Sequence, residues 1–262
     1  MTDKKNKKKH TGRAKRAAKR RLHLFLKALL RPVFELLFHV RVLGKENYPK
    51  DRPVLLITNH LCNLDIPMIL FRTPGYKRAI AKKELGNNKL FKLFASSVGV
   101  IFIDRGATDL EATREILTTL KEGDNLSLFP EGTRNRVNTE LQELKPGGAM
   151  FALKGGAVVV PVMIYRRQKF FGGNYMYIDK GRRLSDLFGE RADAGKLEAA
   201  TKVMAAMMQG AKDTLADIVE NRRWTALRRQ KSARKRQSRL YARQAKKGLA
   251  ALRKESKTLA RA

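Results

Sequence analysis

Short apolar runs alternate with helical segments through the middle of this chain, and this alternation limits the folds that are open to it. Several runs contain no polar side chain, as expected of strands that are covered on both faces of a sheet. The candidate strands are residues 54–58, 79–81, 101–103, 126–129, 158–162 and 176–178. Together they predict an α/β domain in which helices flank a layered mixed sheet.

Two helices of this region are clearly indicated. Thr108 and Glu111 form a capping box at the start of the first, and Gly123 follows its end. The second has an apolar face that includes Met204 and Met208, and we expect these methionines to fill the core. We therefore expect the globular domain at residues 44–221.

The charge of the chain is extreme and lies mostly at its two ends. There are 57 Lys and Arg against 24 Asp and Glu, a formal net charge of +33. Residues 1–21 form one basic tail, and residues 222–262 form another that we expect to be helical or disordered. Chains this basic bind polyanions, which include nucleic acid, anionic lipid and acidic proteins. Cys62 is the single cysteine, so no internal disulfide can form and a reducing compartment is expected.

Residues 22–43 differ from the basic tail before them. Their apolar side chains follow helical spacing, whereas Lys27, Arg31 and Glu35 lie four residues apart as an opposite stripe. Pro32 should kink the segment or divide it into two helices. Two interpretations stay open: amphipathic helices packed on the domain core, or helices in a lipid interface with the basic tail near anionic headgroups. The segment has neither the pattern of a signal peptide nor an apolar run long enough to span a membrane.

A histidine and an aspartate follow the first candidate strand of the domain. His60 comes directly after that strand, and Asp65 stands five residues later, at a turn or in the first turn of a helix. A carboxylate there can bind one imidazole nitrogen and fix the tautomer, so that the other nitrogen can take a proton from an attacking hydroxyl. The spacing suits a general base and its orienting residue. Taken alone, however, a hydrogen-bonded structural histidine is the commoner reason for such a pair.

Two further segments place polar or flexible residues beside strands. Arg105 ends the strand at 101–103 and is placed to reach a phosphate, although taken alone an ion pair with Asp104 is the simpler interpretation. Lys145 and Gly147 precede the strand that contains Pro161. These residues could shape an acyl-binding wall, but the apolar strand itself is better explained as core.

The string Phe-Pro-Glu-Gly-Thr-Arg at residues 129–134 is the most specific signal, because packing alone gives no reason for its composition. Arg134 offers a planar fork of donors that matches a phosphate. Glu131 would align that fork or bind a glycerol group, and Gly132 lets the backbone approach a ligand closely. With Thr133 between them, these residues predict a phosphate-binding turn at the end of a strand.

The four segments, in this order, resemble the motifs of the glycerolipid acyltransferases, the group that contains the lysophosphatidate acyltransferases. That family carries an Asn-His-x4-Asp motif, a second motif with Arg, a Pro-Glu-Gly-Thr-Arg motif and an apolar motif with Pro. The segment Ala-Lys-Lys-Glu-Leu at 81–85 also resembles a stretch between the first two motifs. The resemblance covers about residues 42–180 and leaves out the tails. Cys62 and Asn135 stand where the family usually or often has Ser.

This resemblance implies a glycerol-3-phosphate acyltransferase-like fold and an activity. A fatty acyl group would pass from acyl-CoA or acyl carrier protein to the free hydroxyl of lysophosphatidic acid, with no cofactor or metal. His60 would act as general base and Asp65 would orient it. The family's phosphate-binding role would fall to Arg105, Glu131, Gly132, Thr133 and Arg134. Cys62 tempts one to propose a covalent thiol, but the family reaction resembles direct transfer.

The expected setting is the cytoplasmic side of the cell membrane, where the protein would attach peripherally to the lipid surface that holds its acceptor. A different lysolipid acceptor is an alternative that the motifs do not exclude. A second alternative is a nucleic-acid-binding protein, supported by the basic tails. Against it, the tails contain almost no aromatic side chain apart from Tyr241, and no nucleic-acid-binding module is recognisable.

Overall fold

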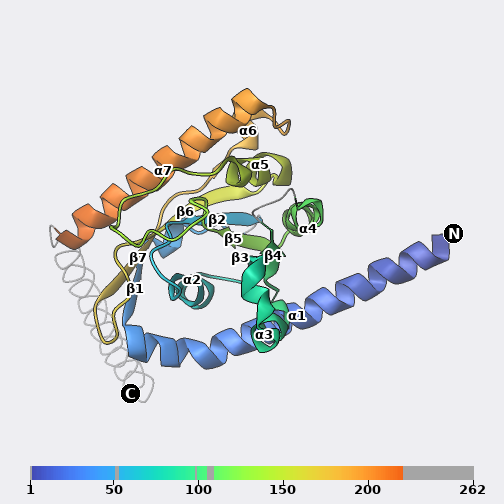
Figure 1. The fold of residues 1–262 in the computed structure, drawn as a ribbon, viewed down its shortest axis with the longest axis horizontal. Coiled ribbons are helices and arrows are strands. Elements are labelled where there is room, and N and C mark those ends of the chain that lie inside the picture. The colour runs from blue at the N-terminus through green and yellow to red at the C-terminus, as the bar shows by residue number, and fades with distance from the viewer. Residues whose placement is uncertain (1, 51–52, 98, 105–108, 221–262) are drawn as a thin grey trace, which may run out of the picture. The chain divides into compact units, whose positions relative to one another are not determined.

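A mixed eight-stranded sheet forms the centre of the fold (Figure 1). The structure is a computed structural model, and it describes residues 2–50, 53–97, 99–104 and 109–220. The chain divides into two compact units at residues 215 and 216, and the sheet belongs to the first. Seven strands follow the order β1-β7-β6-β2-β5-β3-β4, and β8 pairs with β6. The strands are β1 Val40–Leu43, β2 Val54–Thr58, β3 Lys77–Lys82, β4 Ile101–Ile103, β5 Asn125–Leu128, β6 Val158–Ile164, β7 Asn174–Ile178 and β8 Arg182–Arg183.

The central strands explain why the sequence shows continuous apolar runs. Every residue of β2 and of β6 is buried, because helices cover both faces of the sheet there. β2 runs parallel to β5 on one side and to β6 on the other. The α/β sheet with flanking helices that the alternation predicts is therefore confirmed. β1 and the two-residue β8 were not predicted.

The helices divide between the two faces of the sheet (Figure 1). One face is covered by α2 (Asp65–Arg72) and α3 (Lys89–Ser97), the other by α4 (Leu110–Lys121), α5 (Pro146–Gly155) and α7 (Ala194–Glu220). Short helices complete the chain at η1 (Lys45–Asn47), η2 (Lys83–Asn87) and α6 (Ser185–Phe188). Met204 and Met208 of α7 are buried, as expected of core residues. The cap of α4 is Asp109, which accepts the Ala112 N–H, whereas Thr108 of the expected capping box lies outside the described residues.

The N-terminal segment forms one helix, α1 (Thr2–Phe38), that continues through Pro32. The expected division into two helices is therefore not seen, and residues 2–21 are helical. Residues 40–43, which the helical spacing had included, form β1 instead. They pair with β7, with Val40 opposite Asn174, so tertiary pairing overrides the local pattern.

Two residues of the polar stripe of α1, Lys27 and Glu35, contact the domain. Lys27 Nζ donates to the carbonyl oxygens of Thr73 and Gly75, the latter at 3.1 Å. Glu35 pairs with the buried guanidinium of Arg72 from α2. These contacts satisfy charged groups that would otherwise be desolvated without a partner. These polar contacts add to the apolar packing of the helix on the domain.

The apolar side chains of α1 divide into two sets. His23, Phe34 and Phe38 are buried against the domain. A second set forms a stripe that points into solvent, and we call it the outer stripe: Phe25, Leu29, Val33 and Leu36, each more than half exposed. Both interpretations of the segment thus have a structural counterpart, because α1 packs on the core and also leaves an apolar face uncovered. None of the helices in the described part of the chain is long and apolar enough to cross a membrane.

Candidate active site

The loops that follow β2 and β5 meet because these parallel strands are neighbours and end at the same edge of the sheet. Asn59, the first residue after β2, exchanges hydrogen bonds of 2.9 and 2.8 Å with the backbone of Ile164 at the end of β6. The N–H of Asn135 donates to the carbonyl of His60 at 2.8 Å. The backbone at His60 is therefore held from two sides.

His60 and Asp65 form a hydrogen-bonded pair. His60 Nδ1 lies 2.9 Å from Asp65 Oδ2, and the same oxygen accepts the N–H groups of Leu61 at 2.6 Å and Cys62 at 2.7 Å. Asp65 is fully buried at the start of α2. An ionised carboxylate only accepts, so the pair fixes His60 as the tautomer with the proton on Nδ1. Nε2 then carries the free lone pair that a general base needs.

An aromatic contact also positions the ring of His60. It stacks on Phe129, with ring centroids 4.0 Å apart and an interplanar angle of 20°. The His60 side chain keeps 14% of its surface exposed, whereas its partner Asp65 keeps none. The imidazole is therefore oriented by a buried carboxylate and an aromatic face, and a substrate can still reach it.

Glu131 supports the catalytic loop rather than the arginine of its own motif. Its carboxylate is buried and accepts the N–H groups of His60 at 3.2 Å and Gln142 at 3.4 Å. Burial raises the pKa of Glu131 to about 7, while the two backbone hydrogen bonds oppose the shift. The expectation that Glu131 aligns the guanidinium of Arg134 is not met, because the partner of that guanidinium is Asn63.

Arg134 lies beside the histidine loop. Its Nη1 donates to Asn63 Oδ1 at 2.7 Å, which links the turn after β5 to the loop after β2. Gly132, with φ 72°, makes the turn that brings Arg134 there, and a side chain at that conformation would be strained. Thr133 is exposed between them. A cation with free donors is thus held near His60, as a phosphate site requires.

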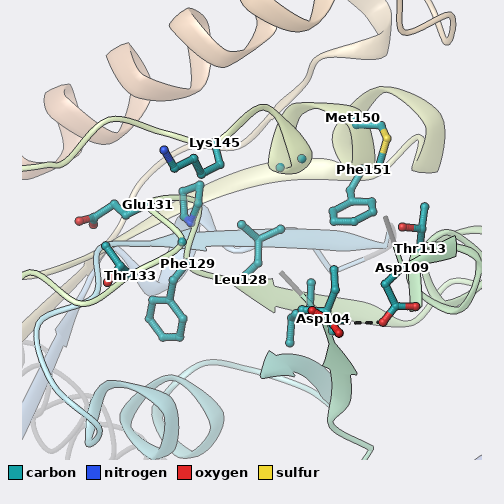
Figure 2. A pocket seen from close by; sticks show the side chains of 16 residues that line it. Asp104, Asp109, Thr113, Leu128, Phe129, Glu131, Thr133, Lys145, Met150 and Phe151 are labelled. Carbon is teal, nitrogen blue, oxygen red and sulfur yellow. Dashed lines mark hydrogen bonds between the residues drawn. The ribbon is translucent and has the colours of Figure 1, made fainter. Parts of the chain in front are cut away.

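A cavity of about 560 Å³ opens from these loops and runs along the sheet, and we call it the β5 cavity. Figure 2 shows Phe129, Glu131 and Thr133 at one end, and Met150, Phe151 and Thr113 toward the other. Lys145 and Gly147 also line it, and their pocket-shaping role stays a prediction. Pro161 is buried in β6 opposite Ile57, and it is not among the described residues that line the cavity.

Two further groups that the sequence singled out are Arg105 and Cys62. Arg105 lies outside the described residues, although its neighbour Asp104 lines the β5 cavity. The Cys62 thiol donates to Asp65 Oδ1 at 3.4 Å and to Gln168 Oε1 at 3.1 Å. Burial, and next the charge of Asp65, raise the pKa of Cys62, so the thiol stays protonated at neutral pH. Within the described ranges, no group of three or more His, Cys, Asp or Glu is placed to hold a metal ion.

Sequence reasoning missed the residues that hold the site together. Asn59, Asn63 and Phe129 lie inside the motif segments, but the sequence analysis gave them no role. For Phe129 a signal existed, since an aromatic residue at the end of a buried strand next to a polar turn is placed to contact the site. The partners of Asn59 and Asn63 lie 105 and 71 residues away, which no local pattern reveals.

With this geometry, comparison with known proteins is informative. A model of the acyltransferase family matches residues 39–165, which include β1, the His60–Asp65 pair, Arg134 and the β5 cavity. Residues 39–165 of the chain belong to the acyltransferase family. The match ends at the loop after β6 and leaves out α7 and both basic ends.

Relatives of this acyltransferase carry a consistent name. A 1-acyl-sn-glycerol-3-phosphate acyltransferase of Borreliella burgdorferi is 33% identical over 139 residues, which are 52% of this chain and 55% of that protein. The protein of that name from Saccharomyces cerevisiae is 31% identical over 194 residues, 68% of this chain and 60% of that protein. The chain thus spans about half the length of the curated relatives it matches, and somewhat more of the yeast one.

One solved structure has the same fold. The 1-acyl-sn-glycerophosphate acyltransferase of Thermotoga maritima superimposes with a TM-score of 0.57 and 24% identity, over 78% of this chain and 82% of that one. At this identity the likeness concerns the fold alone.

Proposed function

We propose that this acyltransferase moves a fatty acyl group from a carrier thioester, acyl-CoA or acyl carrier protein, to the free hydroxyl of lysophosphatidic acid. The main support for this proposal is the His60–Asp65 pair. Its imidazole is oriented by a buried carboxylate and lies beside an apolar cavity. The names of the curated relatives support this acceptor, and another lysolipid with a phosphate remains the alternative.

The chemistry follows from the tautomer of His60. Nε2 takes the proton of the acceptor hydroxyl while its oxygen attacks the thioester carbonyl. The tetrahedral adduct then expels the carrier thiolate, which recovers the proton from the imidazolium. An ester bond forms, a thioester bond breaks, and the enzyme returns to its starting state. Asp65 stabilises the imidazolium and is not itself protonated.

Two neighbouring features provide for the substrates. Arg134, held by Asn63, would bind the acceptor phosphate through its remaining donors. The β5 cavity would take the donor acyl chain, because Ile80, Leu128, Met150 and Phe151 give it an apolar interior. The thioester carbonyl would then lie near Phe129, next to the histidine.

Attachment to a lipid surface is part of the proposal. The outer stripe of α1 leaves four large apolar side chains in solvent, while Lys27 and Glu35 of the same helix contact the domain. A helix oriented this way is suited to lie in an interface with its apolar face toward lipid. Basic residues near the headgroups would each contribute about 1 kcal/mol of attraction. We place the protein peripherally, on the cytoplasmic side of the cell membrane.

The decisive experiment measures transfer of labelled acyl groups to lysophosphatidic acid in mixed micelles, with acyl-CoA and acyl carrier protein as separate donors. We expect the wild type to transfer from at least one donor. His60→Ala should lose about 10²- to 10⁴-fold in kcat, the range that general base catalysis supplies. Its circular dichroism should stay that of the wild type.

Cys62→Ser is the matched control for this experiment. It changes a neighbour of Asp65 whose thiol is protonated, so activity should stay within a few-fold of the wild type. Near-wild-type turnover by His60→Ala would remove His60 from the mechanism. Loss of all transfer in Cys62→Ser, with the fold kept, would point to a thiol nucleophile instead.

A further inference from the structure

A second cavity, of about 390 Å³, lies between α1, α2 and the segment around α3. We call it the α1–α2 cavity. Its lining is apolar, with Leu26 and Leu30 from α1, Ile66, Leu70 and Phe71 from α2, and Leu85 from η2. The α1–α2 cavity is lined by α2 and the β5 cavity by α5. These two helices lie on opposite faces of the sheet (Figure 1). Nothing in the proposed transfer has yet used this space.

The polar residue Asn63 connects the α1–α2 cavity to the active site. Asn63 lines the cavity, and its side chain holds the guanidinium of Arg134 at 2.7 Å. It also stands between His60 and Asp65 in the loop after β2. Phe129 lines the β5 cavity and stacks on the ring of His60. The histidine loop thus has one apolar cavity beside Phe129 and another beside Asn63.

We infer that the α1–α2 cavity binds the aliphatic chain that the acceptor already carries. This inference rests on the proposed function. A phosphate bound by Arg134 would lie next to Asn63, so the chain attached to the same glycerol backbone would have the α1–α2 cavity, which Asn63 lines, within reach. The β5 cavity would remain for the donor chain. The enzyme would then select its acceptor by chain length independently of its donor.

The lining of the cavity argues for a flexible hydrocarbon. Its residues are aliphatic or aromatic apart from His23 and Asn63, so it offers few groups for a polar ligand to bind. One wall is α1, whose other side carries the outer stripe. A chain drawn from a lipid surface would therefore move from one side of α1 to the other. Burial of each additional methylene should tighten binding about fourfold until the cavity is filled.

The test compares acceptors whose chains range from six to eighteen carbons, with wild type, Leu70→Trp and Leu26→Trp. The two substitutions fill the same cavity from opposite walls. If one variant does not fold, the other still tests the inference. We expect the ratio of variant to wild-type acceptor KM to rise at least tenfold between the shortest and longest chains. Partition of the lipid into micelles cancels in this ratio. The preferred length of the donor chain should not change.

Met150→Trp, which fills the β5 cavity, is the matched variant. It should shift the donor chain preference and leave the acceptor profile as in the wild type. Our inference is overturned if Leu70→Trp and Leu26→Trp shift the donor preference instead, or if the acceptor KM ratio is flat with chain length. Absence of transfer by the wild type would count against the proposed function rather than against the cavity assignment.

A binding experiment without turnover tests the cavity assignment separately from the proposed function. Lysophosphatidic acid with a diazirine at the end of its chain is irradiated on His60→Ala, and the labelled peptides are sequenced. Labelling should fall on residues 22–30 or 66–71, and Leu70→Trp should reduce it severalfold. Labelling at residues 148–151 would place the acceptor chain in the β5 cavity and sink the inference.

Discussion

Two side chains of the same motif, Glu131 and Arg134, have different roles in this site. Glu131 is buried and holds the backbone of His60, whereas Arg134 is partly exposed and has donors left for a ligand. A motif of adjacent residues thus contains one group that maintains the catalytic loop and one that meets substrate. We therefore expect substitution of Arg134 to change the acceptor KM, and substitution of Glu131 to change the pH dependence of stability.

Arg134→Ala should weaken binding of the acceptor much more than the chemical step. A charge-assisted hydrogen bond to phosphate is worth about 1.5–3 kcal/mol, so the acceptor KM should rise about 10- to 100-fold with a smaller change in kcat. Arg136→Ala, an exposed arginine two positions later, is the control and should behave as wild type. An unchanged acceptor KM in Arg134→Ala would show that the phosphate binds elsewhere.

Glu131 should impose a pH dependence on stability. Its pKa is about 7 in the folded protein and 4.5 as a free side chain, so between these values the folded state binds more protons than the unfolded state. The free energy of unfolding therefore falls as pH rises through this window. Glu131→Gln cannot ionise, and relative to wild type it should gain up to about 3 kcal/mol between pH 4.5 and pH 7.

Urea unfolding at intervals of half a pH unit measures this difference. Glu143→Gln, an exposed glutamate of the same loop, is the control and should follow the wild type at every pH. Parallel curves for Glu131→Gln and wild type would mean that the carboxyl of Glu131 is ionised throughout.

For single residues, the sequence predicted which side chains could act as base and orienting residue. It did not predict which side chains they would contact across the fold. The roles of His60 and Asp65 rest on spacing within one loop, and the structure brings their side chains together as expected. The partner of Arg134 could not be predicted, because Asn63 is adjacent only through the pairing of β2 with β5. Pro161, which could have shaped an acyl-binding wall but was better explained as core, lies in a fully buried strand and is not among the described residues that line the β5 cavity.

Among the elements, α1 departs most from its sequence pattern. Helical periodicity identifies two stripes but does not say which one meets the protein. The carbonyls of Thr73 and Gly75 and the guanidinium of Arg72 decide this, because they give Lys27 and Glu35 partners that the surface of the domain alone provides. The same limit applies to β1, whose residues continue the helical spacing yet pair with β7.

The outer stripe predicts a specific defect in lipid binding. Phe25→Asn combined with Leu29→Asn should lower binding to vesicles of anionic lipid at least tenfold, because each side chain contributes about 1.5–3 kcal/mol on burial. Co-sedimentation with vesicles measures this. Both positions are exposed, so the thermal midpoint should stay within a few degrees.

Val137→Asn is the control, since Val137 is 88% exposed and belongs to a loop rather than to α1. It should bind vesicles as the wild type does. Equal binding by the double variant would assign membrane attachment to charge alone.

For the whole molecule, the alternation of apolar runs and helices predicted the sheet, because strands buried on both faces have a composition that surfaces and loops do not share. It could not predict strand order, which places β7 between β1 and β6 although 130 residues separate β1 from β7. The basic residues 222–262 lie outside the described residues, so their role stays a prediction.

Removal of residues 225–262 should separate the two functions that the sequence suggests. The family match and the described site lie before this segment, so acyl transfer should stay within about twofold of the full chain. Binding to a polyanion such as RNA should weaken, with a smaller dependence on salt. Filter binding and the transfer assay, run on the same preparation, test both. Loss of transfer with the fold kept would make the tail part of the enzyme.

The position of α1 as a wall of the α1–α2 cavity has a consequence for the end of the reaction. The diacyl product would have one chain in each cavity, and it would be poorly soluble in water. With its inner side against the bound chain and its outer side apolar, α1 would make departure a lateral transfer into the bilayer. Turnover would then depend on how fluid the surrounding lipid is, even though no step of bond formation involves it.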